Sequence, residues 1–336
     1  GAASVAQAVT ATTAGSLKIG VEFESMDAGT DTNNVKDQSN FNISLSETTD
    51  AGTTISSSFE IVDESTVAAD DDNAIKLTFT DGSALELLNA GNAAGTHVVA
   101  VPGAGGEQGV AGTTTNNAPG DVDFGATATA LGVEWHSAAD FLADGLKMSA
   151  SYSTDSGAAA TATARLDSSW GVGATYVTTA GDTTLTIGGG VADSETSTTG
   201  TQPNSDRAGF NVGISAVTGD LTVGVGYGDG DTLISDDLTQ ANTEVDGSVL
   251  KAGISYVTGD ITLAVGISSG EGSDGVFGTA GTTDDSNDST SASVTYAVAS
   301  GVSAVLGYTT TDAANEGVST TDGSGSAWYV GATMSF

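Results

Sequence analysis

The chain has 336 residues and a net charge of −36 at pH 7, because 43 Asp and Glu face only 7 Lys and Arg. A surface this acidic argues against nucleic acid as a partner, since phosphate binding needs a basic face. The chain has no Cys, which excludes disulfides and zinc–thiolate sites. With 47 Gly, 3 Pro and many Thr, Ser, Ala and Val, the composition favours strands and tight turns over helices.

Apolar side chains stand at every second position in segments along the whole chain, beginning with Leu17, Ile19, Val21 and Phe23. A period of two predicts β-strands with one apolar face. None of the segments approaches the ~20 apolar residues of a membrane helix, whereas a barrel strand needs only about 9–11. About sixteen segments occur, in chain order at 17–23, 41–45, 55–61, 75–79, 85–87, 124–135, 146–152, 162–176, 185–191, 210–214, 221–227, 250–256, 261–267, 292–298, 302–308 and 326–336.

In the sixth segment the apolar phase slips by one residue between Ala130 and Leu131, which predicts a β-bulge. The connections alternate between short and long, and the Gly and Asp of the short ones suit turns with positive φ. The short set is 49–52, 81–83, 136–145 (its longest member), 180–182, 218–220, 258–260 and 300–301, and the long set is 26–38, 62–73, 89–121, 155–159 (its shortest member), 193–206, 229–246, 269–289 and 311–325. This alternation is typical of up-and-down barrels in the outer membrane, and an even strand number places both termini on the periplasmic side.

The closing strand carries the most specific signal. Trp328, Val330, Ala332, Met334 and Phe336 alternate, and the sequence ends on an aromatic residue of that apolar face. Together with the rhythm of strands and loops over nearly the whole chain, this strand resembles the general, trimeric porins of Gram-negative bacteria. The resemblance implies that Trp328, Val330, Met334 and Phe336 form the signal that the barrel assembly machinery reads.

The resemblance further implies an all-β fold, a transmembrane antiparallel up-and-down β-barrel of about 16 strands with a long inserted loop after strand 5. We expect an N-terminal extension at 1–14, the barrel at 15–336 and a constriction loop at 89–121 that folds inward. The expected partners are the lipid bilayer and lipopolysaccharide, the assembly machinery, two further copies in a homotrimer, and small hydrophilic solutes and ions. The small residues at Ala6-Gln7-Ala8 fit a cleavage site, so we expect an exported chain whose signal peptide has been removed.

The charged residues of the predicted strands are out of phase with the apolar face and would point into the lumen of a barrel. The alternative is an amphipathic strand whose polar face meets bulk solvent, because parity alone does not distinguish the two. The chain departs from the related porins in having only two Arg, so their ion preference is not carried over. The residues expected to line the pore are Lys18, Glu22, Glu24, Glu60, Lys76, Glu86, Glu107 (on the constriction loop), Glu134, Lys147, Arg165, Asp167, Arg207 and Lys251.

A channel and mouth with this acid excess would concentrate cations, so we expect a water-filled diffusion channel with a cation preference. On the apolar face we expect Val223 and Ile254 in contact with lipid, while their neighbours Gly224 and Ser255 face the lumen and tolerate polar replacements. An aromatic girdle at the headgroup level is the expected role of tyrosines near strand ends, and strand aromatics in a sandwich core are the alternative. These tyrosines are Tyr152, Tyr176, Tyr227, Tyr256, Tyr296 and Tyr308.

Aspartate clusters in the long connections are compatible with weak Ca²⁺ sites or with solvated acidic loops, and none has EF-hand spacing. They comprise Asp70, Asp71, Asp72, Asp236, Asp237, Asp284 and Asp285. They also support a rival interpretation, an acidic Ca²⁺-binding surface-layer or adhesin protein built of β-sandwiches. No nucleophile elbow, phosphate loop or metal-ligand spacing occurs in the sequence, so we do not expect an enzyme or a cofactor beyond Ca²⁺ in the outer loops.

Overall fold

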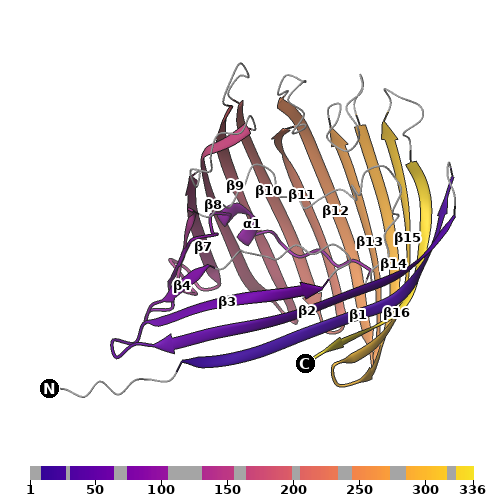
Figure 1. Ribbon diagram of the computed structural model, residues 1–336, viewed down its shortest axis with the longest axis horizontal. Helices are drawn as coiled ribbons and strands as arrows, with labels where there is room; N and C mark the ends of the chain where they lie inside the picture. Colours follow the sequence, from indigo (N-terminus) through magenta and orange to yellow (C-terminus); the bar gives the residue numbers. More distant parts are fainter. Residues whose placement is uncertain are drawn as a thin grey trace.

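The computed structural model describes residues 9–27, 31–63, 74–104, 131–154, 164–198, 205–233, 244–272, 285–315 and 323–336. Sixteen strands lie in this part of the chain, and they form one closed antiparallel barrel (Figure 1). The first and last strands pair along eleven positions, from Ser16 opposite Ser335 to Met26 opposite Gly325, and thereby close the sheet. The predicted fold class is confirmed, and the described strands do not form the sandwich of the rival interpretation.

The strands differ strongly in length around the barrel. Strands β8 to β16 have 12 to 17 residues, whereas β4, β5 and β6 have four each. A one-turn helix, α1 (Ala93–Thr96), follows β5. The strands are β1 (Thr10–Met26), β2 (Thr32–Thr48), β3 (Thr54–Asp63), β4 (Ile75–Thr78), β5 (Ala84–Leu87), β6 (Val133–His136), β7 (Leu146–Thr154), β8 (Ala164–Ala180), β9 (Thr183–Thr198), β10 (Ser205–Thr218), β11 (Leu221–Leu233), β12 (Glu244–Thr258), β13 (Ile261–Gly272), β14 (Asp285–Ala299), β15 (Val302–Asn315) and β16 (Gly323–Ser335).

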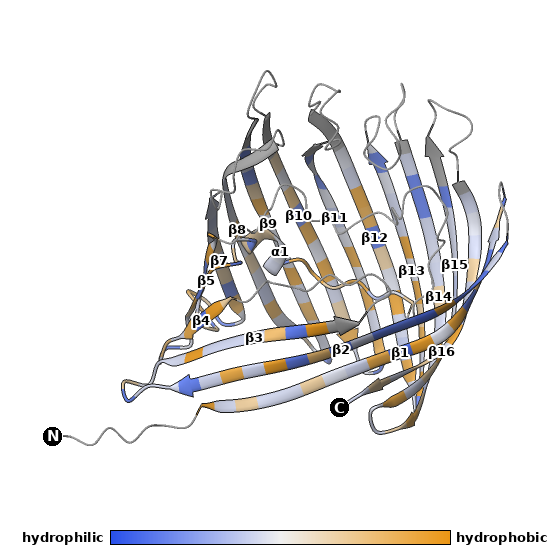
Figure 2. Ribbon diagram, viewed as in Figure 1, coloured by the Kyte–Doolittle hydropathy of each residue, from blue (hydrophilic) through white to orange (hydrophobic). Residues whose placement is uncertain are grey.

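The barrel carries its apolar side chains on the outside. In β7 the side chains of Ser149, Ser151 and Ser153 are buried, while Ala150 and Tyr152 between them are exposed. The same alternation of apolar and polar positions runs along β9 to β15, where orange and pale bands follow one another in Figure 2. An exposed apolar face around a small or polar interior is the reverse of a water-soluble barrel and matches a barrel that spans lipid. No helix in the described ranges is long and apolar enough to cross a membrane.

The six tyrosines predicted for the girdle all lie on this outer face, whereas the seventh, Tyr329, is buried on the inner face. Tyr176, Tyr256 and Tyr296 stand near the short turns, whereas Tyr152, Tyr227 and Tyr308 are followed by the polar residues Thr154, Asp229 and Thr310 on the outer face toward the opposite strand ends. The ring of Tyr308 packs on that of Trp328 with centroids 4.4 Å apart, and Tyr227 lies 6.0 Å from Phe210. Amphipathic rings at both edges of an apolar band suit the two membrane interfaces.

The short connections adopt the predicted turns. A glycine with positive φ, between 56° and 86°, stands in each of six of them, a conformation that an L-residue with a Cβ rarely adopts. The seventh, after β6, is longer and has Gly145 at a φ of 80°. The six glycines are Gly52, Gly82, Gly181, Gly219, Gly259 and Gly301.

The strands extend further than the apolar pattern predicted. Strand β11 continues to Leu233, six residues beyond its predicted end, and β2 begins at Thr32, inside the predicted loop 26–38. Strand β1 begins at Thr10, so residues 10–14 belong to the barrel and not to the N-terminal extension. The physical reason is that the backbone ladder does not depend on side-chain polarity, so it continues where polar residues interrupt the apolar alternation. The predicted bulge between Ala130 and Leu131 falls at the edge of a segment outside the described residues.

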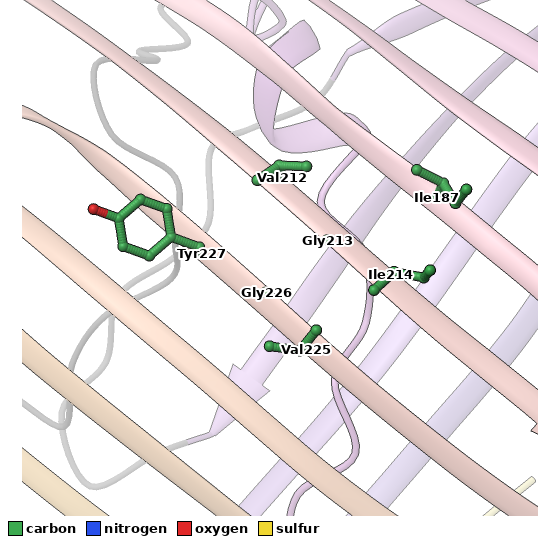
Figure 3. Close-up of a pocket in the computed structure, with 7 residues that line it drawn as sticks. All are labelled: Ile187, Val212, Gly213, Ile214, Val225, Gly226 and Tyr227. Atoms are coloured by element: carbon green, nitrogen blue, oxygen red, sulfur yellow. The ribbon is translucent and has the colours of Figure 1, made fainter.

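A shallow apolar depression of about 200 Å³ lies on the outer wall across β9, β10 and β11 (Figure 3). Its side chains are those of Ile187, Val212, Ile214, Val225 and Tyr227. Gly189 stands opposite Val212 and contributes no side chain to this face. Four of these five side chains are aliphatic, and the hydroxyl of the fifth, Tyr227, donates to Asp229 at 2.9 Å, which agrees with the assignment of this wall to the lipid side.

The central lipid-facing positions provide a test of the barrel orientation. Val223 and Ile254 are direct cross-strand partners and are 39% and 43% exposed on the outer face. We expect Ile254→Arg to lower the free energy of unfolding by about 2–4 kcal/mol in lipid vesicles, because the guanidinium must enter hydrocarbon. The inner-face control Ser255→Asn should change it by less than about 0.5 kcal/mol. Urea unfolding of the reconstituted protein measures both, and equal losses would contradict the orientation.

The C-terminal residue belongs to the closure of the barrel. Phe336 N–H donates to the carbonyl of Gly15 at 3.1 Å, and Gly15 N–H donates to the carbonyl of Phe336 at 3.2 Å. The Phe336 ring covers Gly15, where a Cβ would lie 2.5 Å from Phe336 Cζ. The centroids of the Phe336 and Phe41 rings are 6.3 Å apart. Trp328, Val330 and Met334 share its exposed face.

We expect deletion of Phe336 to reduce the amount of folded barrel several-fold, since two backbone hydrogen bonds and the cover of Gly15 are lost. Phe336→Tyr keeps both features and serves as the control. A heat-modifiability gel of outer-membrane fractions measures the folded amount. Unchanged folded protein after the deletion would show that Phe336 is not part of an assembly signal.

Candidate pore constriction and its charged wall

The chain turns into the barrel directly after β5. The described part of the inserted loop, residues 88–104, lies against the inner face of β7 to β13. The backbone of the loop is bonded to wall side chains: Ala93 N–H donates to Ser151 Oγ at 3.0 Å, and Asn211 Nδ2 donates to the Ala94 carbonyl at 3.1 Å. The predicted inward path therefore holds for residues 88–104, while the rest of the predicted loop lies outside the described residues.

A row of inner-face glycines makes room for this loop. At Gly190 a Cβ would lie 2.6 Å from Ala94 Cα, and at Gly213 it would lie 2.8 Å from Val99 Cβ. At Gly253 it would overlap the carbonyl oxygen of Pro102. Only a residue without a side chain fits such close backbone approaches. We call this row the glycine track; it comprises Gly171 and Gly173 on β8, Gly188 and Gly190 on β9, Gly213 on β10, Gly224 on β11, Gly253 on β12 and Gly266 on β13.

The glycine track corrects one sequence expectation. Gly224 does face the interior, but a Cβ there would lie 3.0 Å from Pro102 Cδ and 3.3 Å from Val101 Cα. The loop covers this position, so a polar replacement would displace it. The signal was available in the sequence as glycines at inward positions of consecutive strands, but nothing in the sequence indicated which segment they receive.

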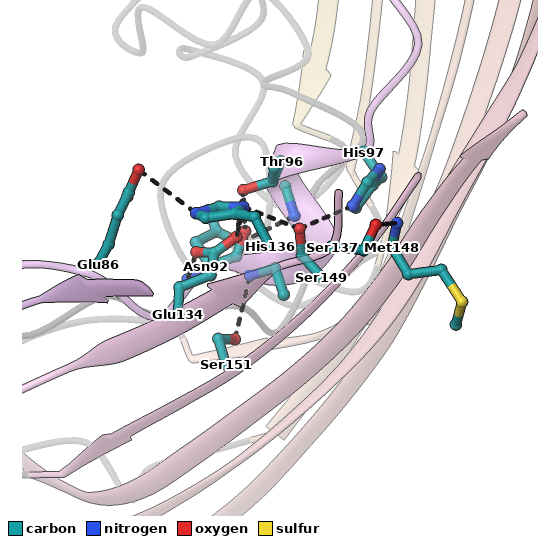
Figure 4. Close-up of polar contacts among 12 residues, drawn as sticks. Glu86, Asn92, Thr96, His97, Glu134, His136, Ser137, Met148, Ser149 and Ser151 are labelled. Atoms are coloured by element: carbon teal, nitrogen blue, oxygen red, sulfur yellow. Dashed lines mark hydrogen bonds and ion pairs between the residues drawn. The ribbon is translucent and has the colours of Figure 1, made fainter. Parts of the chain in front are cut away.

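Side chains of the loop and the wall meet in a polar cluster at the start of the track (Figure 4). Ser149 Oγ lies 3.0 Å from His97 Nε2 on the loop and 3.0 Å from His136 Nδ1 on β6. His97 Nδ1 lies 2.7 Å from Thr175 Oγ1 on β8. Thr96 Oγ1 donates to Glu134 Oε1 at 2.6 Å. We call these residues, His97, Ser149, His136, Glu134 and Thr96, the loop anchor.

The loop anchor compensates two opposed carboxylates. Glu86 and Glu134 face each other across β5 and β6, a position where like charges repel. His136 lies between them, with Nε2 3.3 Å from Glu86 and Nδ1 3.7 Å from Glu134. Lys76 Nζ is 2.6 Å from Glu86, and the Asn92 N–H donates to Glu134 at 3.1 Å. Glu134 therefore accepts hydrogen bonds from the loop, at Asn92 and Thr96, while His136 of the wall lies beside it.

His97 is the buried titratable group of the loop. Burial lowers the pKa of His97 to about 4, and the positive charges of His136 and Lys147 act in the same direction. The neutral ring is therefore the form that fits the docked loop at neutral pH.

A second charged contact lies away from the loop anchor, between β1 and β2. Lys36 Nζ is 3.0 Å from Glu22 Oε1, and the Glu22 side chain is fully buried. Glu24 accepts a hydrogen bond of 2.7 Å from Thr32 Oγ1. Lys36 was not predicted to line the pore, because it lay in the predicted loop 26–38. Its alternation with Asn34 and Gln38 was the signal in the sequence that could have placed it on the inner face of a strand.

The described side chains expected to line the pore all lie on the inner face. For Arg165 and Asp167 in β8 and Arg207 in β10, the structure describes the backbone but not the side chain. Glu107 lies outside the described residues. With Lys36 added, the inner face carries five Lys and five Glu among the described side chains, so the wall is balanced where the sequence suggested an acid excess. These residues are Lys18, Lys36, Lys76, Lys147 and Lys251, with Glu22, Glu24, Glu60, Glu86 and Glu134.

The Ca²⁺ sites stay a prediction. Asp70, Asp71, Asp72, Asp236, Asp237 and Asp284 are outside the described residues, and Asp285 is described only by its backbone. Elsewhere in the described ranges, no group of three His, Cys, Asp or Glu is arranged to hold a metal ion.

A closed barrel with an apolar exterior, a polar interior and an inserted loop defines an outer-membrane barrel of the channel-forming class. The family model of Gram-negative porins matches residues 1–316, and the chain belongs to this family. Its location is accordingly the outer membrane. No curated protein matches the chain.

Solved structures share the fold at low sequence identity. An anion-selective porin from Comamonas acidovorans is 11% identical with a TM-score of 0.69, and the match covers 98% of this chain and 100% of that one. A porin of known structure is 18% identical with a TM-score of 0.63, over 97% and 100% of the two chains. The trimer form of OmpT from Vibrio cholerae is 16% identical with a TM-score of 0.62, over 98% and 100%.

The close approach at Gly253 yields a prediction about the loop. We expect Gly253→Ala to push Pro102 off the wall, to lower stability by about 1–3 kcal/mol and to reduce the single-channel conductance. Gly103→Ala is the matched control, because a Cβ at Gly103 meets no atom within 4 Å. Planar-bilayer recordings and urea unfolding measure the two effects. Identical behaviour of the two variants would show that the loop does not rest on this glycine.

Proposed function

We propose that the chain forms a water-filled channel for the passive diffusion of ions and small hydrophilic solutes across the outer membrane. The observation that carries this proposal is the inner face, where charged and small side chains surround a loop bound to one wall. A barrel of this strand number leaves an aqueous channel when its interior is polar. The loop docked on β7 to β13 would narrow the lumen from that side, so that size exclusion and wall charge select the solutes.

We further propose a homotrimer. Strand β2 places Asn33, Asp37 and Ser39 on the outer face, in phase with Val35, which is 70% exposed. A carboxylate on a lipid-facing surface is costly, so this part of the wall is better suited to contact with protein. The OmpT structure in its trimer form gives a related fold with that assembly. Three equal closing steps for each inserted unit are the result we expect in planar bilayers.

The proposed cation preference rests on the mouth of the barrel and not on its wall. The strand ends opposite the short turns carry outward carboxylates, while the inner wall is balanced. Arg165 and Arg207 occupy the same strand ends and offset part of this charge. A negative potential at the mouth raises the local cation concentration over a Debye length of about 8 Å at 0.15 M salt. The described carboxylates are Asp193, Glu195, Asp229, Asp231, Glu271, Asp288 and Asp312.

Reversal potentials under a KCl gradient test the preference. We expect cation selectivity at low salt that decreases as the salt concentration rises, because screening shortens the reach of the mouth charges. Glu195→Gln at the mouth should weaken the selectivity, and Glu60→Gln on the balanced inner wall, the matched control, should change it less. Anion selectivity would contradict the proposal and would show that the inner lysines dominate. Glu107→Gln should weaken it most if residue 107 lies at the narrowest point.

A further inference from the structure

The chain has only two histidines, and the structure brings both to one hydroxyl group. His97 belongs to the loop, whereas His136 and Ser149 belong to the wall. Two contacts of 3.0 Å each place the ring nitrogens within about 6 Å of one another. The connection between loop and wall at this point therefore depends on which ring nitrogens carry protons.

The protons of this cluster have a preferred arrangement. Both nitrogens of His136 lie near carboxylates, Nε2 3.3 Å from Glu86 and Nδ1 3.7 Å from Glu134. Ser149 has one proton to donate, and a neutral His97 can accept it at Nε2 while its Nδ1 donates to Thr175. A proton added to His97 would place a second cation beside His136 and remove the acceptor that Ser149 uses.

We propose that His97 is an acid-sensitive latch: in its neutral form it holds the inserted loop on the wall, and its protonation releases the loop into the lumen. The consequence for conduction rests on the proposed channel function. The latch itself is a property of the loop and the wall and can be measured without conduction.

The surrounding charges set the direction of the response. The cations facing His97 are His136 on β6 and Lys147 on β7, and the carboxylates of the cluster, Glu86 and Glu134, are occupied by Lys76, His136 and loop donors. No charged side chain reaches His97 from the described parts of β8 and β9, where Thr175, Gly173 and Gly188 contact it. The environment therefore opposes a positive charge on His97 as long as the loop is docked.

The pH window follows from linkage. Burial lowers the pKa of His97 from 6.5 to about 4 in the docked loop, so the released loop binds the proton more tightly. A lowered pKa means that acid favours the released state: docking is at full strength above about pH 6.5, weakens as the pH falls, and reaches its limit below about pH 4. Between these values the equilibrium constant for docking falls about tenfold for each pH unit.

Thiol labelling of the folded, full-length protein in vesicles tests the latch. The chain has no Cys, so a single introduced thiol is labelled specifically. Val99 is buried against Gly213 on the glycine track, while its neighbour Ala100 is exposed. We expect the ratio of labelling rates of Val99→Cys to Ala100→Cys to rise about tenfold per pH unit below pH 6.5, since the ratio cancels the pH dependence of thiol reactivity.

Two variants distinguish the latch from general acid effects. In a His97→Gln background the amide still bonds to Ser149 and Thr175 but does not titrate, so the ratio should stay constant. Lys147→Glu replaces a repelling cation with an anion, so it stabilises the protonated His97 ring in the docked loop and should make the acid-driven rise of the ratio smaller, which keeps the test informative even if His97→Gln does not fold. A ratio that is independent of pH, or that rises equally with His97→Gln, would overturn the latch.

Recordings in planar bilayers separate the latch from the channel proposal. A conducting channel with a pH-independent labelling ratio would contradict the latch alone. A protein that shows the predicted labelling but does not conduct at any pH would contradict the proposed function alone.

Discussion

The requirement that every backbone amide and carbonyl find a partner within lipid governs this structure. A sheet satisfies it only when it has no free edge, and here the pairing of β1 with β16 removes the last one. The outward apolar side chains follow from the same requirement, since one face of each strand meets hydrocarbon. The period-two sequence is the direct expression of that constraint. It also explains why Phe336 is bonded at both its N–H and its carbonyl to Gly15, at the joint of the sheet.

The interior depends on a second backbone problem. A loop inside a barrel brings its own amides and carbonyls, and these must also be bonded. Here wall side chains bond some of them: Ser151 accepts from Ala93, Asn211 donates to Ala94, and Ser153 donates to Ala90. Close packing on the glycine track adds to these bonds, and at Gly173, Gly190 and Gly253 a side chain would have to displace the loop. The wall of β7 to β13 is therefore shaped for this loop, and its serines and glycines are parts of one site.

Much of the fold could be predicted because alternation is a local signal. The strands, the six glycine turns and the outward tyrosines can each be predicted from residues that are close together in the sequence. The ends of β2 and β11 could not be predicted, because the strands continue where polar side chains interrupt the outward apolar alternation. For that reason Lys36 was not predicted to face the interior, and the sequence therefore suggested an acid excess on an inner wall whose described charges are balanced. The loop anchor joins His97 to residues 52 and 78 positions away, and no local pattern encodes such pairs.

The proposed channel has a lipid-facing exterior around an aqueous interior that one loop partly covers. Labelling of single cysteines along β12 and at Val99 of the loop by a water-soluble thiol reagent, with the protein folded in vesicles at neutral pH, tests all three parts together. We expect labelling at Lys251 and Ser255, protection at Ala252 and Ile254 by lipid, and protection at Val99, which is buried against Gly213 of the wall. Equal labelling of Ile254 and Ser255 would contradict a barrel that separates lipid from water.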